Sequence, residues 1–439
     1  MVTNKNLTRA RHHIVFLAAL IFGSVLIYFL NGLDMRKQGL GVIVLKNTIA
    51  PEHNITKTLL TQKELSYAKT AWKYFENNYH ETTGMVNSVD KYPSSTLWDM
   101  GNYLMALISA KELGIIDEIT YDTRMTKILT SLGKLPLYNN LLPNKAYHSE
   151  TLKMTNYENK VSKKGIGWSA IDIGRILIPF SYLQYNQPQY SKKLHHILSQ
   201  WNIKKMTKQG ALYGVVVKKG KESILQEGRL GYEQYTSKMF ATFGVDISNA
   251  LRYDKYLEYK DIYGVNIPYD KRDKEHSDAN NYVLMEPYML DGLEFGWDYF
   301  SHEFSYRLYK AQEERYKDTG ILTAVTEDHI DKAPYFIYNS IFVNKKAWVA
   351  IDETGKVRKN LKQLSTKASF AMDVLYNTSY TKKLMKTIEK LQSPEGWYTG
   401  IYEKDNIINK SLTCNTNAIV LEALFYKQNG PIVQMINNQ

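Results

Sequence analysis

The stretch GWSAIDIGRILIPFSYL, residues 167–183, is apolar on nearly every side of the helix that it predicts. A helix without a wide polar face has to be buried among other elements. The same character recurs in five other segments: WDMGNYLMALISAKEL (98–113), LGYEQYTSKMFATFG (230–244), residues 286–296, STKASFAMDVLY (365–376) and residues 415–427. The sequence therefore predicts six buried helices.

Helices of a second type precede the buried ones. In residues 63–78 a narrow apolar stripe runs through Leu65, Ala68, Trp72 and Phe75, at the spacings of three and four that mark a helix with one wet face. Comparable stripes occur in residues 122–132, 189–202, 303–317 and 379–391, and a short segment near 247–257 is the predicted sixth.

The two helix types alternate along the chain in about six pairs. This order predicts a mainly α fold, an (α/α)6 toroid, in which an inner ring of buried helices lies inside an outer ring. A generic helical bundle would not require such alternation. Two segments look like β-hairpin insertions, residues 211–226 and 335–350.

The N-terminal region predicts a membrane anchor. Residues 14–30 carry no charge and are just long enough to span a bilayer. Lys5, Arg9 and Arg11 precede them, which predicts a cytoplasmic N-terminus. We expect a cytoplasmic segment (1–13), a transmembrane helix in the lipid bilayer (14–33), a tether (34–60) and a toroid domain (61–439) on the outer side of a bacterial inner membrane. A cleavable signal peptide is the alternative, although no A-x-A-like site follows the apolar run.

The composition and the absence of certain motifs limit the classes of function that the chain can have. The net charge of +12 fits a lysine-rich solvated surface or, alternatively, one that favours anionic membranes or polyanions. No basic run with interleaved aromatic residues suggests nucleic acid. The single cysteine, Cys414, excludes an intramolecular disulfide. No zinc motif, phosphate-binding loop or dinucleotide fingerprint is present, so neither a metal nor a cofactor is predicted.

In a toroid of this kind, all outer-to-inner connections emerge at one end, here called the mouth. Carboxylate, aromatic and amide residues gather on or near those connections, which is typical of a carbohydrate site, and hydrolysis of a glycosidic bond needs two carboxyl groups. The catalytic candidates are Asp99, Glu227, Glu327 and Asp328. The substrate-binding candidates are Trp98, Trp168, Tyr232, Glu233, Glu286, Glu294, Trp297, Tyr335 and Asn417.

Several of these carboxylates also have structural interpretations. Asp99 is placed to bind free N–H groups at a helix N-terminus, and Glu233 to pair with Arg229 one turn earlier. Glu286 and Glu294 can serve as buried hydrogen-bond acceptors. Asp172 and Arg175, three residues apart on an apolar helix, suggest a structural ion pair.

Several motifs resemble those of the bacterial family called domain of unknown function 3131. The matching stretches include YPSSTLWDMGNYL, IGWSAIDIGRIL, LQEGRLGYEQY, NYVLMEPYMLDGLEFGW and TGILTAVTEDHIDKAPYFIYN, and they run from about residue 71 to 424. The resemblance implies an (α/α)6 domain related to glucoamylase-like and β-1,2-glucanase-type glycoside hydrolases. It assigns no catalytic residue.

These observations predict an envelope-anchored glycoside hydrolase or transglycosylase that acts on a bacterial glucan or exopolysaccharide. Envelope polysaccharide assembly proteins are its candidate protein partners. Two alternatives stay open: a non-catalytic polysaccharide-binding or assembly subunit, and a polysaccharide lyase or epimerase.

Overall fold

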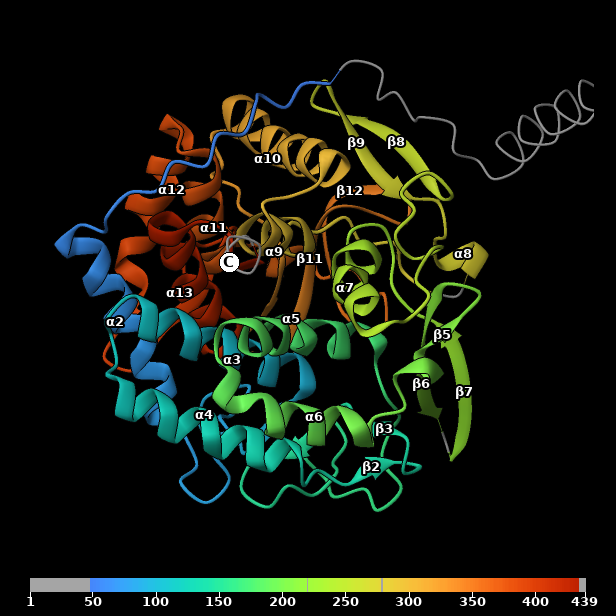
Figure 1. The fold of residues 1–439 in the computed structure, drawn as a ribbon. Helices are drawn as coiled ribbons and strands as arrows, with labels where there is room; N and C mark the ends of the chain where they lie inside the picture. The colour runs from blue at the N-terminus through green and yellow to red at the C-terminus, as the bar shows by residue number, and fades with distance from the viewer. Residues whose placement is uncertain (1–47, 219, 278, 434–439) are drawn as a thin grey trace, which may run out of the picture. The chain divides into compact units, whose positions relative to one another are not determined.

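The inner ring of the predicted toroid is present in the computed structural model, which describes residues 48–433 except 219 and 278 (Figure 1). Each inner helix packs against the next, and the last packs against the first, so the ring closes. Its members are α3 (Leu97–Glu112), α5 (Ala170–Asn186), α7 (Tyr232–Phe240), α9 (Glu286–Phe295), α11 (Thr366–Tyr376) and α13 (Cys414–Asn429).

Glycines allow close packing on one side of this ring. A Cβ on Gly174 of α5 would lie 2.6 Å from the Thr236 Cβ on α7, and one on Gly101 of α3 would lie 3.0 Å from the Arg175 Cγ on α5. A larger residue at Gly174 would therefore push α5 and α7 apart.

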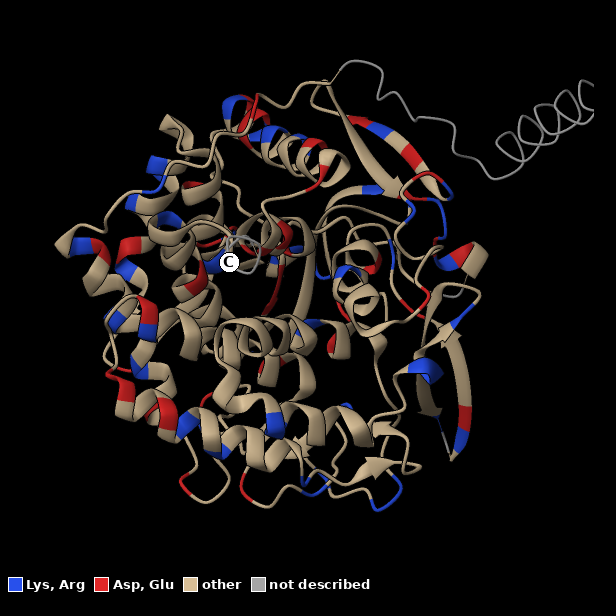
Figure 2. Cartoon of the chain, in the orientation of Figure 1, with Lys and Arg blue, Asp and Glu red and all other residues tan. Residues whose placement is uncertain are grey.

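Outer helices cover the ring, and charged residues of both signs are interspersed over these helices, the loops and the strands (Figure 2). This distribution fits the predicted solvated surface. Among the described residues, the outer helices are α2 (Gln62–Asn77), α4 (Glu118–Leu132), α6 (Ser191–Gln200), α10 (Tyr299–Thr319) and α12 (Ser379–Ile388).

The helix predicted near 247–257 was wrong. The segment forms turns and then enters strand β8, because its backbone N–H groups find tertiary partners: those of Asn249 and Ala250 donate to the Gly210 carbonyl at 3.0 and 2.7 Å. Its apolar pattern is also too short to sustain a helix by itself.

The strands lie on the outer-to-inner connections, at the N-terminal ends of the inner helices. The predicted hairpins at 211–226 and 335–350 are confirmed as β6–β7 and β11–β12, whereas β8–β9 and the sheet around β15 were not predicted. The strands, all paired antiparallel, are β1 (Ser94–Thr96), β2 (Leu137–Tyr138), β3 (Leu142–Pro143), β4 (Ala146–His148), β5 (Thr207–Lys208), β6 (Ala211–Lys218), β7 (Lys221–Gln226), β8 (Leu257–Ile262), β9 (Val265–Asp270), β10 (Glu327–His329), β11 (Phe336–Val343), β12 (Lys346–Ile351), β13 (Gln363–Ser365), β14 (Gln392–Ser393), β15 (Gly396–Tyr402) and β16 (Ile408–Leu412).

The end of the predicted tether belongs to the globular unit. The N–H groups of Ile49 and Ala50 both donate to the Glu303 carboxylate of α10 at 2.9 Å, and the Thr58 N–H donates to the Lys427 carbonyl at the end of α13. The predicted anchor at 14–33 lies outside the described residues. Within the described part of the chain, no helix is long and apolar enough to cross a membrane.

Candidate active site

Polar side chains occupy the first turn of every inner helix. Because the inner helices run in the same direction, their N-termini meet at the mouth, where unpaired N–H groups favour acidic and other polar residues. The first-turn residues are Asp99 of α3, Asp172 of α5, Tyr232 of α7, Glu286 of α9, Lys367 of α11 and Asn415 of α13.

Lys367 organises one side of this ring. Its ammonium group donates to the Glu286 carboxylate and to the Asn415 amide oxygen, the latter at 2.6 Å. The Asn415 amide nitrogen in turn donates to Glu286 at 2.8 Å. The Asp328 carboxylate lies 3.8 Å from the same ammonium group. We call Glu286, Glu327, Asp328 and Lys367 the mouth cluster.

Glu327 differs from the other acids of the mouth cluster because no cation binds it directly. Strand β10 places it opposite Tyr338, and the Tyr232 hydroxyl donates to one carboxylate oxygen. Its other oxygen has no hydrogen-bond partner among the described residues. Burial, together with the charge of Glu286, raises the pKa of Glu327 to about 8. These surroundings favour the protonated form of Glu327.

Asp328, the next residue, is also buried and carries no hydrogen bond among the described residues. Burial raises the pKa of Asp328 to about 7, against the opposing charge of Lys367. The adjacent acids thus point to different surroundings, Glu327 toward Tyr232 and Asp328 toward the buried ammonium group.

Aromatic rings surround Glu327. The Tyr282 and Tyr338 rings stack with their centroids 4.0 Å apart and their planes at 13°. Trp98 meets Tyr232 edge to face at 5.7 Å. Each of these four side chains is only partly buried, so solvent reaches their edges. Partly exposed rings beside carboxyl groups are suited to the apolar faces of sugars.

A second pair of acids lies at the start of α5. The Ala170 N–H donates to the Glu227 carboxylate at 2.6 Å, so Glu227 satisfies a free group at the helix N-terminus. Burial and the charge of Glu227 raise the pKa of Asp172 to about 7. Asp172 is half-buried and makes no ion pair with Arg175, so the interpretation of these two residues as a structural pair was wrong.

Arg175 instead binds two other glutamates inside the ring. Its guanidinium donates to Glu294, to Glu422 at 2.7 Å, and to the Asn102 oxygen at 2.9 Å. The Tyr235 hydroxyl bridges Arg175 and Glu294, at 3.0 and 2.7 Å. These residues come from five inner helices and are buried; we call them the core cluster.

Three of the predicted carboxylates are bound by structural partners. Asp99 accepts hydrogen bonds from the Thr96 hydroxyl at 2.8 Å and the Asn102 side-chain amide at 3.1 Å, in place of the free backbone N–H groups of its structural interpretation; Thr96 caps the helix instead. Glu294 belongs to the core cluster. Glu233 pairs with Arg272 at 2.9 Å, in place of the suggested Arg229, and lies in a separate pocket.

Four predicted binding residues are not part of the mouth cluster and, in the described part of the chain, form no hydrogen bond or ion pair with it. Trp168 is buried against Tyr138, and Asn417 is buried, where it binds the Trp397 N–H at 2.8 Å. Trp297 follows the C-terminus of α9, at the opposite end of the ring. Tyr335 is 65% exposed beside β11. The structure thus brings together Trp98, Tyr232, Glu286, Glu327 and Asp328 from the predicted set.

The sequence reasoning missed Lys367 and Asn415, and it misassigned Asp172. A signal was present for Lys367, since it is a lone cation in the first turn of an otherwise apolar helix. The stacking of Tyr282 on Tyr338 had no signal in the sequence, because Tyr282 lies in the loop before α9 and Tyr338 lies on β11.

One group of potential metal ligands is found in the described part of the chain: Asp273, Glu275 and His276, at the short helix α8 (Lys274–Ser277). Asp273 already binds the His276 ring nitrogen at 2.6 Å, and Glu275 and His276 are exposed. This group is remote from the mouth cluster and gives no support for a catalytic metal.

The closed inner ring, covered by outer helices and with polar residues at one end, defines the (α/α)6 toroid fold. A glucoamylase-like protein from Bacteroides caccae has this fold, at 11% identity over 86% of this chain and 96% of that one, with a TM-score of 0.62. An endo-β-1,2-glucanase from Chitinophaga pinensis, solved with sophorotriose and glucose, has 11% identity over 87% and 96%, with a TM-score of 0.60. An endo-β-1,2-glucanase variant from Talaromyces funiculosus, solved with β-1,2-glucan, has 13% identity over 85% of each chain, with a TM-score of 0.56.

The chain belongs to the DUF3131 family, described as a protein of unknown function, whose profile matches residues 66–430. No curated protein matches the sequence significantly. At these identities the solved structures establish the fold, and the chemistry has to be argued from this chain's own residues.

Proposed function

We propose that the chain is a glycoside hydrolase that cleaves a glucan, with Glu327 as the general acid. The placement of Glu327 carries this proposal, because one of its oxygens is buried without a partner among the described residues and no cation binds it directly; burial and the charge of Glu286 accordingly raise its pKa to about 8. Protonation of the leaving glycosidic oxygen requires a carboxylic acid that keeps its proton at neutral pH. The unpartnered oxygen of Glu327 is available to hold that proton, while Tyr232 fixes the other.

Asp172 is the best candidate for the second carboxyl group. Its pKa of about 7 suits a base that must accept a proton from water near neutral pH. Glu227 is less suited, because one of its oxygens is bound to the Ala170 N–H. The charges of Asp172 and Glu227 act on Tyr157, and those of Glu327 and Tyr157 act on Tyr338, which supports the assignment of the two acids to one site.

β-1,2-Glucan is the first substrate to test, since proteins of this fold from Chitinophaga and Talaromyces were solved with sophorotriose and β-1,2-glucan. The partly exposed rings of Trp98, Tyr282 and Tyr338 give a neutral glucan apolar surface to contact.

The test is release of reducing ends from β-1,2-glucan and other bacterial polysaccharides. Glu327→Gln and Asp172→Asn should each lower the rate at least about a hundredfold. Glu353→Gln is the matched control: Glu353 is exposed, yet close enough to influence Tyr338 and Tyr282, and this variant should keep wild-type activity. Wild-type rates in both Glu327→Gln and Asp172→Asn would reject the assignment.

The pH dependence gives a second check. Asp172 has to be ionised and Glu327 protonated, so the rate should peak between about pH 7 and pH 8 and fall on both sides.

Saturable glycan binding without turnover would favour the binding or assembly subunit instead. An unsaturated product that absorbs ultraviolet light would favour a lyase.

We also propose that residues 14–33 anchor the enzyme in the inner membrane, with the toroid on the outer side, near exported polysaccharides and the proteins that assemble them. The uncharged run at 14–30 and the preceding Lys5, Arg9 and Arg11 support this topology. A periplasm-active reporter fused to the C-terminus should be active; activity only from a cytoplasm-specific reporter would reject it.

A further inference from the structure

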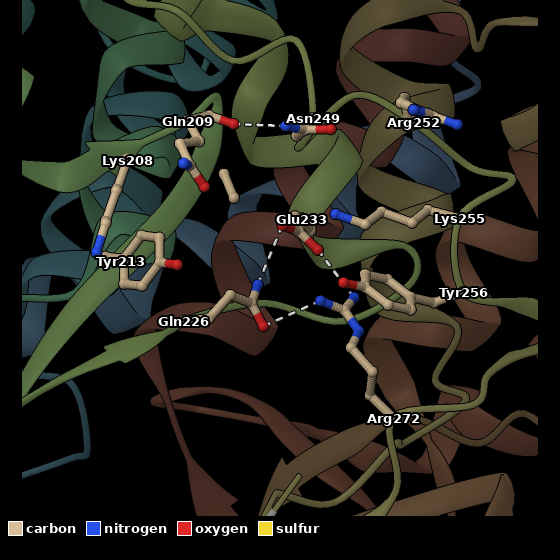
Figure 3. Close-up of a pocket in the computed structure, with 11 residues that line it drawn as sticks. Lys208, Gln209, Tyr213, Gln226, Glu233, Asn249, Arg252, Lys255, Tyr256 and Arg272 are labelled. Atoms are coloured by element: carbon tan, nitrogen blue, oxygen red, sulfur yellow. Dashed lines mark hydrogen bonds and ion pairs between the residues drawn. The ribbon is translucent and has the colours of Figure 1, made fainter. Parts of the chain in front are cut away.

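A pocket of about 110 Å³ lies between the β5–β7 sheet, the first turn of α7 and the segment 249–256 (Figure 3). This segment belongs to the region where an outer helix was predicted and turns are found instead. Glu233, Gln226 and Arg272 form the inner part of the pocket, and Lys208 and Lys255 lie at its rim.

The pocket is distinct from the mouth cluster. Tyr232 and Glu233 are consecutive residues of α7, and a helix directs neighbouring side chains about 100° apart. Tyr232 donates to Glu327 in the mouth, whereas Glu233 accepts from Gln226 at 3.0 Å and from Arg272 at 2.9 Å in the pocket. No group in the pocket takes part in the proposed hydrolysis.

The arginines of the pocket are neutralised. Arg272 binds Asp270 at 2.5 Å as well as Glu233, and Arg252 binds Asp254 at 2.6 Å. Lys208 and Lys255, in contrast, have no carboxylate partner within the described residues. The cations of the pocket that form no ion pair among the described residues are therefore the two lysines, on opposite walls.

The remaining groups suit a sugar. Tyr213 lines the pocket, and its ring makes no aromatic contact in the described part of the chain, which leaves it available for stacking. The side chains of Gln209, Gln226 and Asn249 provide amide donors and acceptors for hydroxyl groups. One face of Tyr256 is covered by the Arg272 guanidinium, 3.9 Å from the ring centroid, which fixes that wall.

We propose that this pocket is an ancillary glycan-binding site that takes a sugar unit bearing an anionic group, with Lys208 and Lys255 holding the charge and Tyr213 contacting the ring. Carboxylate and phosphate substituents share this chemistry. The proposal goes beyond the hydrolase function and does not depend on it, because the site would retain a charged polysaccharide whatever reaction occurs at the mouth.

The test is calorimetric titration of the full chain, in detergent, with D-glucuronate, glucose 6-phosphate and D-glucose. At least one anionic sugar should bind with a Kd of about 1 mM, and glucose at least about tenfold more weakly. The stronger of the two anionic probes identifies the substituent. Equal affinity for glucose, or no binding of either anionic probe, would overturn the proposal.

Variants locate the site. Lys208→Ala with Lys255→Ala should weaken binding of the anionic probe at least about tenfold. Lys218→Ala with Lys221→Ala is the matched control, because these exposed lysines pair on the same hairpin outside the pocket and carry the same charge. Equal weakening in both double variants would indicate non-specific attraction and reject the site.

Glu327→Gln separates the two proposals. This variant should lose hydrolysis and keep the affinity for the anionic probe. Loss of that affinity in Glu327→Gln would place the probe at the mouth and overturn the ancillary site.

Discussion

The core cluster and the mouth cluster are built from the same kinds of residue and behave differently. In the core cluster, Arg175 binds Glu294 and Glu422 through separate guanidinium nitrogens. In the mouth cluster, Lys367 binds Glu286 and lies 3.8 Å from Asp328, but makes no direct contact with Glu327. Each cluster places one cation among two or more carboxyl groups, the core cluster inside the inner ring and the mouth cluster at its N-terminal end.

The difference lies in how directly the cation binds the acids. In the core cluster burial also raises the pKa of Glu422, although Arg175 binds it directly. Arg175 has a planar fork of donors and is fully buried, and Asn102 and Tyr235 complete its bonding. Lys367 has a single compact ammonium group that three acids compete for. An acid left without a cation keeps its proton, which is what general acid catalysis requires. The comparison indicates that the core cluster maintains the ring, and that the mouth cluster is arranged for chemistry.

Arg175→Met should give the largest effect. It leaves two buried carboxylates without their cation, and the free energy of unfolding should fall by about 3–5 kcal/mol. Urea denaturation measures this loss. Adding Glu294→Gln and Glu422→Gln should restore part of it, because the uncompensated charges are removed. An unchanged urea midpoint in Arg175→Met would contradict the structural role of the core cluster.

Lys367→Met should cost less, about 1–3 kcal/mol, because Glu327 keeps its proton and Asp328, whose pKa is raised to about 7, can take one up when the ammonium group is lost. The loss should grow as the pH rises and these two acids ionise. Lys367 opposes the raised pKa of Glu327, so its removal should also move the alkaline limb of activity to higher pH. Lys367→Arg, which keeps the charge, is the control. A loss independent of pH would argue against shared protons in the mouth cluster.

Glu327→Gln should change the pH dependence of stability. The pKa of Glu327 is raised to about 8 in the folded chain, whereas in the unfolded chain the carboxyl ionises near its ordinary value of 4.5. The unfolded state therefore releases its proton first, and wild-type stability falls between about pH 4.5 and pH 8. Glutamine cannot ionise, so the variant should gain stability relative to wild type across this range, measured as thermal midpoints. A constant difference from pH 5 to pH 8 would contradict the raised pKa.

Tyr232→Phe should have the smallest effect, about 1 kcal/mol of stability, because only one hydrogen bond is lost. That bond lowers the pKa of Glu327 in opposition to burial, so the alkaline limb of the pH–rate profile should move upward. Tyr235→Phe, its counterpart in the core cluster, should reduce stability without moving the limb. A downward movement in Tyr232→Phe would show that the hydroxyl does not favour the ionised acid.

Much of the fold could be predicted because its signals are local. The apolar stripe of α2 and the nearly uniform apolar character of α5 report how each helix is solvated, and periodicity alone reveals this. The segment at 247–257 failed because Gly210, distant in sequence, supplies the carbonyl that its N–H groups bind. Local pattern contains no information about such a partner.

The candidate site could be predicted by region and not by role. That the mouth would hold acids and aromatic residues follows from the alternation of helices, which sends every outer-to-inner connection to one end. The sequence could not distinguish the roles of Asp99 and Glu294 from that of Glu327. In the structure, side-chain hydrogen bonds bind Asp99, and Arg175 binds Glu294.

The sequence by itself determined the helices, their alternation and the end of the toroid where polar residues gather, since these depend on spacing along one chain. Only the tertiary structure decided which acid keeps its proton. The partners of Arg175 and Lys367 lie on helices that are far apart in sequence. A pKa depends on burial and on neighbouring charges, and both exist only once the ring has closed.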